Sequence, residues 1–138
     1  FLRLMDLLAR RIFLPISRTD NVRSLVGMEN LVDLICCCIK HPDAAGKVFL
    51  VSDDKDVSTS ELIKKICNAM GKSQFFVPIP FFLLKILGRI IGKSSEIERL
   101  FGNLQVDCSN TLNVLGWRPP VSFDDEILKT VQWYLNQK

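Results

Sequence analysis

The sequence predicts an α/β domain that is mostly helical with a few short strands, and three observations support this fold class. Several stretches repeat apolar residues at the spacing of one helix face. A β-branched apolar run at residues 48–51 stands between turn signals, which is typical of a strand. A length of 138 residues, with 48% apolar and 24% charged composition, suits one globular domain that folds without metal or disulfides.

The first part of the chain is expected to contain a helix, an extended segment and a strand. Apolar residues recur at helical spacing from the start: Leu4, Met5, Leu8 and Ile12. Pro15 should end this helix, because proline has no amide hydrogen to donate. Residues 14–17 should be extended, and a polar turn then leads into a strand over residues 23–26.

A second helix and a second strand are predicted next. The helix is marked by Leu31, Val32, Ile35, Cys38 and Ile39. It should stop at His41 and Pro42, and we interpret His41, the single histidine, as a residue that caps a helix end rather than as a catalytic base. The strand at residues 48–51 should be buried on both faces. A solvated acidic turn should follow it, formed by Asp53, Asp54 and Asp56.

Capping signals locate the later helices. Ser58 has capping-box spacing to Glu61, so a third helix should begin there and end at Gly71. An apolar helix over residues 81–91 and a short helix over residues 94–100 should follow.

Two more helices are expected after an extended segment at residues 104–106. Asp107 or Ser109 can cap the first of them, and Gly116 should stop it. The last helix has a capping-box-like start at Ser122 and Asp125, and its inward face should consist of Ile127, Leu128, Val131, Tyr134 and Leu135.

Charge and cysteine usage exclude several classes of function. The net charge is +3 and the basic residues are scattered, so nucleic-acid binding is not expected. No C-x-x-C pair or metal-ligand spacing occurs among the five cysteines, so we expect no metal and interpret the triplet at residues 36–38 as apolar packing within a helix. Free thiols suit a reducing cytoplasm. The most hydrophobic segment, residues 75–91, is too short and too charged for a membrane span.

Two short motifs resemble catalytic signatures, and we interpret both as structural. Tyr134 and Lys138 have Y-x-x-x-K spacing, but Tyr134 belongs to the inward face of a terminal helix. The glycines at 88 and 92 are one residue too close for a phosphate-binding P-loop and follow a helical run rather than a strand. No G-x-G-x-x-G occurs, so these residues indicate no dinucleotide site.

Two arginines are candidates for binding phosphate. Arg23 begins a predicted strand directly after a polar loop, and Arg99 could be its partner. A guanidinium presents a planar, permanently charged fork that suits phosphate oxygens. Taken alone, an arginine is more often an ordinary surface residue than a phosphate ligand.

Three segments resemble the extended short-chain dehydrogenase/reductases of the NAD-dependent epimerase/dehydratase family, the UDP-glucose 4-epimerase-like group. Residues 23–33 (RSLVGMENLVD) are similar to that family's R-x-x-V/I-x-V-x-D-L-V segment. Residues 47–53 (KVFLVSD) and 58–62 (STSEL) resemble its strand, loop and helix start, and residues 115–119 (LGWRP) resemble its closing signature. The sequence departs from the pattern at residues 28–30 (MEN instead of V-D-D) and at Glu126, where glycine is usual.

The resemblance implies that the chain is the carboxyl-terminal, substrate-binding part of a Rossmann-type enzyme. The NAD-binding domain and the catalytic residues would then lie before Phe1, so the chain alone would bind no NAD and would be inactive. Residues 48–51 would belong, in the intact parent, to the edge of the Rossmann sheet. The implied reaction is 4-epimerisation of a UDP-hexose through hydride transfer to NAD and back, with 4,6-dehydration or 4-keto reduction as alternatives within the family.

The resemblance also implies a set of substrate-binding residues. Arg23 matches the arginine that holds the diphosphate, and Arg99 matches a second phosphate arginine. The extended segment along the nucleobase corresponds to Leu14, Pro15, Ile16 and Ser17. The expected partner is the nucleotide sugar, with no nucleic acid and no membrane, and a homodimeric parent is compatible with the family. An alternative of another class is an interaction or membrane-surface module that uses the helix at residues 81–91 as an apolar anchor.

Overall fold

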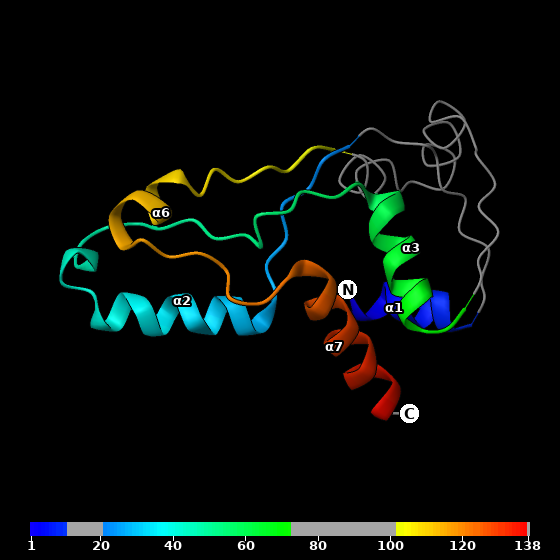
Figure 1. Ribbon diagram of the computed structural model, residues 1–138. Coiled ribbons are helices and arrows are strands. Elements are labelled where there is room, and N and C mark those ends of the chain that lie inside the picture. Colours follow the sequence, from blue (N-terminus) through cyan, green and yellow to red (C-terminus); the bar gives the residue numbers. More distant parts are fainter. Residues whose placement is uncertain (11–20, 73–101, 138) are drawn as a thin grey trace.

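The computed structural model describes residues 1–10, 21–72 and 102–137. These residues form α1 (Leu2–Ala9), α2 (Met28–Lys40), the 3-10 helix η1 (Pro42–Ala44), α3 (Thr59–Ala69), α6 (Ser109–Leu115) and α7 (Phe123–Asn136). Figure 1 shows α2, η1 and α6 toward one end of the molecule and α1, α3 and α7 toward the other, with extended segments between them. The helices predicted at residues 81–91 and 94–100 lie outside the described residues.

The main hydrophobic core lies where α1, α3 and α7 pack together. α3 contributes one apolar face, which includes the fully buried Ile66, and α7 contributes Val131, which is also fully buried. Met5 and Leu8 of α1 close the core from the third side. Burial of each such side chain stabilises the fold by about 1.5–3 kcal/mol, so this core holds the two chain ends together.

A second, smaller core lies between α2 and α6. Leu34, Leu115 and Trp117 form its centre, and Phe49 and Val51 pack against it. The indole Nε1 of Trp117 donates a hydrogen bond to Asp33 of α2 at 2.7 Å. Cys37 and Cys38 also contact this core, which agrees with the interpretation of the cysteine triplet as packing, although Cys36 is exposed.

The predicted helix ends are confirmed where local chemistry sets them. Ser58 accepts a hydrogen bond from the amide of Glu61 at 3.0 Å, and Ser122 accepts one from Asp125 at 3.2 Å. Gly71 and Gly116 both have left-handed backbone, as expected for residues that end helices. His41 ends α2, and its Nδ1 accepts a hydrogen bond from the amide of Asp43 at the start of η1.

The predicted strands are wrong in extent. Residues 23–26 pair only at Arg23, through isolated bridges to Val57 and Leu104. Beyond that residue the carbonyl of Leu25 accepts a hydrogen bond from the amide of Asp53 at 2.9 Å, which satisfies the backbone without a ladder.

Residues 48–51 form no ladder within the described part of the chain, and α6 side chains bond two of their carbonyl groups. Thr111 donates to the carbonyl of Leu50 at 2.6 Å, and Asn110 donates to that of Val48 at 3.3 Å. The expectation of burial on both faces is also wrong. Val48 is 81% exposed and Leu50 is exposed too, whereas Phe49 packs inward. The segment therefore has one buried and one uncovered face.

The expected inward face of α7 is partly wrong. Ile127, Val131 and Tyr134 are buried, but Leu128 and Leu135 are exposed and Glu126 is buried in their place. The hydroxyl of Tyr134 donates to Asp6 of α1 at 2.6 Å, which confirms the structural interpretation of this tyrosine.

Candidate functional site

The backbone of Arg23 lies where three distant segments of the chain meet. Its amide donates to the carbonyl of Val57 at 3.0 Å, and the amide of Val57 donates back at the same distance. On the other side, the amide of Ser24 donates to Leu104 at 2.8 Å and the amide of Leu104 donates to Val22 at 2.9 Å. Arg23 is therefore held from both sides by residues that are not its neighbours in sequence.

Side chains fix the residues that flank Arg23. Asn21 donates to the hydroxyl of Thr59 at 2.8 Å and accepts a hydrogen bond from the amide of Thr59, which ties this segment to the start of α3. The hydroxyl of Ser24 donates to Asp56 and accepts a hydrogen bond from the amide of Val106 at 2.9 Å. These contacts restrict where the Arg23 side chain can reach.

Asp56 is the carboxylate that Ser24, the residue after Arg23, contacts. Hydrogen bonds from Gln105 and from Ser24 hold the pKa of Asp56 below its ordinary value, so the group is ionised at neutral pH. Within the described residues no ion pair joins Arg23 to Asp56 or to another carboxylate, and the Asp56 oxygens accept from neutral donors instead. The positive charge of the Arg23 guanidinium is therefore not neutralised by a carboxylate of the described residues, and an anionic ligand could neutralise it.

The side chain of Arg23 carries an unsatisfied buried donor. Its Nε is buried and has no hydrogen-bond partner in the described part of the chain. A buried donor without a partner costs about 1–3 kcal/mol, so such groups call for an explanation in a native structure. An anion that accepts from this nitrogen would remove the cost and neutralise the charge.

The other predicted substrate-binding residues lie outside the described residues. These are Arg99, Leu14, Pro15, Ile16 and Ser17. Of the predicted substrate-binding residues, Arg23 alone has its surroundings described. Lys138, the lysine of the Y-x-x-x-K spacing, and the glycines at 88 and 92 also lie outside the described residues.

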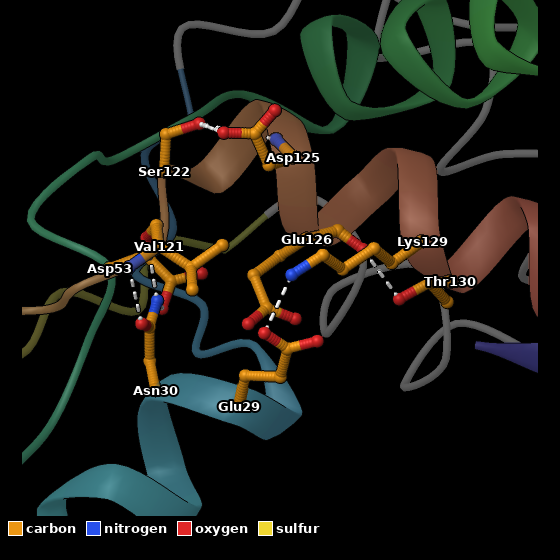
Figure 2. A network of polar contacts seen from close by, with 9 residues as sticks. All are labelled: Glu29, Asn30, Asp53, Val121, Ser122, Asp125, Glu126, Lys129 and Thr130. Carbon is orange, nitrogen blue, oxygen red and sulfur yellow. Dashed lines mark hydrogen bonds and ion pairs between the residues drawn. The ribbon is translucent and has the colours of Figure 1, made fainter.

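A buried polar network that sequence reasoning missed connects the Arg23 segment to α2 and α7. Asn30 is completely buried and donates to Asp53 and to the carbonyl of Val121, both at 2.8 Å. It also accepts from the amide of Val121 at 2.9 Å. Figure 2 shows Asn30 rising from α2 toward these partners. The Asp53 carboxylate also accepts a hydrogen bond from the amide of Gly27.

The interpretation of Asp53 as part of a solvated turn is wrong. Asp54 and Asp56 are exposed as predicted, but Asp53 is buried because the amides of Gly27 and Asn30 satisfy its carboxylate. The only local signal was that Asp53 follows the apolar run at residues 48–51 after a single intervening residue, Ser52.

A polar cavity of about 310 Å³ lies beside this network but does not suit a phosphate. Asp54, Asp56 and Asp107 line it together with Ser52 and Cys108. Hydrogen bonds from Ser109 lower the pKa of Asp107, so the lining carries negative charge at neutral pH and repels anions. Among the described residues no cluster of three or more metal-ligating side chains occurs, and no helix is long and apolar enough to cross a membrane.

Comparison with solved structures assigns the fold class. The chain superposes with a TM-score of 0.67 on dTDP-glucose 4,6-dehydratase from Bacillus anthracis in complex with NAD, at 16% identity over 99% of this chain and 38% of that one. It matches the Bordetella bronchiseptica enzyme WbmG, in complex with NAD and UDP, with the same TM-score at 17% identity over 98% of this chain and 38% of that one. The chain therefore shares the fold of a part of these Rossmann-type enzymes.

Sequence comparison identifies the family. The chain is 46% identical to UDP-glucose 4-epimerase of Vibrio cholerae over 98% of its own length, and it spans 42% of that relative. It is 22% identical to 3beta-hydroxysteroid-dehydrogenase/decarboxylase isoform 3 of Arabidopsis thaliana over 83% of this chain and 24% of that protein. No family model matches the chain. The chain belongs to the NAD-dependent epimerase/dehydratase family and corresponds to the carboxyl-terminal part of such enzymes.

Proposed function

We propose that this chain is the substrate-binding part of an NAD-dependent nucleotide-sugar 4-epimerase and that Arg23 holds the diphosphate of a UDP-hexose. The observation that carries the proposal is the buried Nε of Arg23, a charged donor that has no acceptor in the described part of the chain. The 46% identity to a UDP-glucose 4-epimerase favours epimerisation over 4,6-dehydration or 4-keto reduction.

The role of Arg23 follows from its chemistry and its fixed backbone. A guanidinium donates parallel charge-assisted hydrogen bonds to two phosphate oxygens, which fixes orientation as well as charge. Because the hydrogen bonds of Val57 and Leu104 hold the backbone of this segment, little conformational entropy is lost when the ligand binds. A diphosphate held in this way anchors the nucleotide while leaving the hexose ring free to turn toward the reacting groups.

Further substrate contacts are proposed from the resemblance alone. Arg99 would give a second positive charge to the diphosphate, and Leu14, Pro15, Ile16 and Ser17 would lie along the nucleobase. The residues of this chain do not fit NAD, because the sequence contains no G-x-G-x-x-G loop to hold a pyrophosphate. NAD would therefore bind in another part of the parent, where it would accept and return the hydride, and the chain alone would be inactive.

The test is substrate affinity in the full-length parent. Arg23→Ala should weaken UDP-hexose binding by about 1.5–3 kcal/mol, the usual range for hydrogen bonds to charged groups. Arg23→Lys should fall between alanine and wild type, because an ammonium cannot reproduce the two-pronged contact.

The control is Arg118→Ala, which removes an exposed arginine from another part of the surface. It should leave the dissociation constant unchanged. The melting temperature of each variant should not fall below that of wild type, since Nε makes no hydrogen bond within the described residues that the substitution could remove. Unchanged affinity in Arg23→Ala, or a loss that matches a fall in melting temperature, would contradict the proposal.

A further inference from the structure

α2 has two apolar faces, and only one of them is packed. Leu34 and Cys37 face the second hydrophobic core. On a different side of the helix, four apolar residues recur at spacings of four, three and four, which places them in one stripe. This α2 stripe consists of Met28, Val32, Ile35 and Ile39, and all four are exposed. Ile39 is 78% exposed and Met28 is 72% exposed.

Other exposed apolar side chains accompany the α2 stripe. Val26 precedes it in the chain, and Val48 and Leu50 form the uncovered face of the extended segment described above. Single exposed apolar residues are ordinary, but a helix face made of four of them marks a surface that another part of a protein covers.

A cavity with a buried carboxylate adjoins the amino-terminal end of the α2 stripe. It measures about 250 Å³, and its lining includes Phe1, Val26, Met28 and Glu126. Glu126 is only 5% exposed, and its Oε1 is buried without a hydrogen-bond partner in the described part of the chain. Burying a charged group without a partner is costly.

The charged side chains beside Glu126 in Figure 2 do not hydrogen-bond its Oε1. Figure 2 shows Glu29 and Lys129 beside it, but the Lys129 ammonium donates to Glu29 at 2.6 Å. The charge of Glu126 contributes only weakly to the raised pKa of Lys129, for which the hydrogen bond to Glu29 is the main cause. The Glu126 cavity therefore combines a buried carboxyl oxygen that has no hydrogen-bond partner in the described part of the chain with an apolar rim.

We propose that the α2 stripe and the Glu126 cavity together form the docking surface for the part of the parent protein that precedes Phe1, and that this part places a lysine or arginine against Glu126. Phe1 itself lines the cavity, so a chain that continues upstream would leave from this point. More than half of the length of the Vibrio cholerae relative lies outside its match to this chain, which is enough for a domain. To match the apolar stripe and the buried carboxylate, the docked part must present an apolar surface that carries one cation.

The proposal rests on the longer parent of the proposed function but not on its substrate site. Glu126→Gln keeps the shape of the side chain and removes its charge. In the 138-residue chain this change should raise the melting temperature, because an unpaired buried charge disappears. In the full-length parent the same change should lower it, because the cation of the docked part loses its partner. The sign of the change therefore reports whether a cation is present.

A matched pair of neighbouring residues tests the α2 stripe. Ile39→Ser and Lys40→Ser make the same replacement on the last turn of α2, one within the stripe and one outside it. In the 138-residue chain both should leave the melting temperature within roughly 2 °C of wild type, as for most surface substitutions. In the full-length parent only Ile39→Ser should lower it, by roughly 3 °C or more.

Three results would overturn the proposal. A change of the same sign for Glu126→Gln in both proteins would exclude a partner cation. Equal effects of Ile39→Ser and Lys40→Ser in the parent would show that the stripe stays exposed. A dimer of the parent that Ile39→Ser dissociates, seen by sedimentation, would assign the surface to a second copy. Unchanged substrate affinity in Arg23→Ala, which would contradict the proposed function, would change none of these readouts, so the two proposals fail independently.

Discussion

Asn30 offers the most direct test of the packing between α2, the residue 53 turn and α7. Asn30→Ala removes its two donated hydrogen bonds, to Asp53 and Val121, and the one it accepts from the Val121 amide. Asn30 is completely buried, so water does not replace these partners at its position. Each buried group left unsatisfied costs about 1–3 kcal/mol. The costs within one network are not additive, and we expect a loss of about 3–5 kcal/mol in the free energy of unfolding.

The assay is equilibrium unfolding in urea, with circular dichroism as the probe and the midpoint and slope fitted together. Asn110→Ala is the matched control, because Asn110 is exposed and makes one long hydrogen bond, at 3.3 Å, to Val48. It should cost less than about 0.5 kcal/mol. A loss below about 1 kcal/mol for Asn30→Ala would refute the reasoning, since it would mean that the network contributes little beyond exposed contacts.

Three further predictions concern packing, pH and cofactor. A Cβ at Gly27 would overlap the carboxyl end of Glu126, so Gly27→Ala should destabilise by about 1–3 kcal/mol, and Glu126→Ala should remove most of that cost in the double variant. Hydrogen bonds from Lys65, the larger cause, and from Lys55 hold the pKa of Asp124 below its ordinary value of 3.8. The ionised carboxylate therefore stabilises the folded state above that pH. This contribution disappears as the pH falls through the lower pKa of the folded state. Asp124→Asn should therefore cost under about 1 kcal/mol at pH 7 and nothing at about pH 2; an equal cost at both would contradict this. Calorimetric titration of the 138-residue chain with NAD should give no heat of binding, and micromolar affinity would contradict the absence of a pyrophosphate loop.

Helix ends were predictable from sequence because their chemistry is local. Ser58, Ser122 and Gly116 act within a few residues of their own positions, so the spacing of side chains was enough to locate them. The single histidine belongs to the same class, since its partner is the amide two residues later.

Burial of polar residues was not predictable, because their partners lie far away in the sequence. Asp53 looked like one member of an acidic turn, and only the folded chain brings the Gly27 amide to it. Glu126 was noted as a departure from the family pattern, but its packing against Gly27 depends on the approach of α7 to α2. The resemblance assigned the strand at residues 48–51 to the sheet of the intact parent, and among the described residues only side chains of α6 bond its carbonyl groups.

The phosphate-binding role of Arg23 was predicted from the combined resemblance of three segments to the epimerase/dehydratase family. Composition and spacing alone favoured an ordinary surface position for this residue. The buried, unpartnered Nε adds a physical reason that the sequence could not supply, because it depends on segments that close around the residue.

The junction of three segments at Arg23 also sets when the site can form during synthesis. The amide of Val22 bonds the side chain of Asn103, which lies 81 residues later in the chain. At a translation rate of about 5–20 residues per second, the strand-like segment around Arg23 waits about 4–16 s for this partner. The junction around Arg23 is therefore complete only after residues 103 and 104 have been synthesised, well after the Arg23 segment itself.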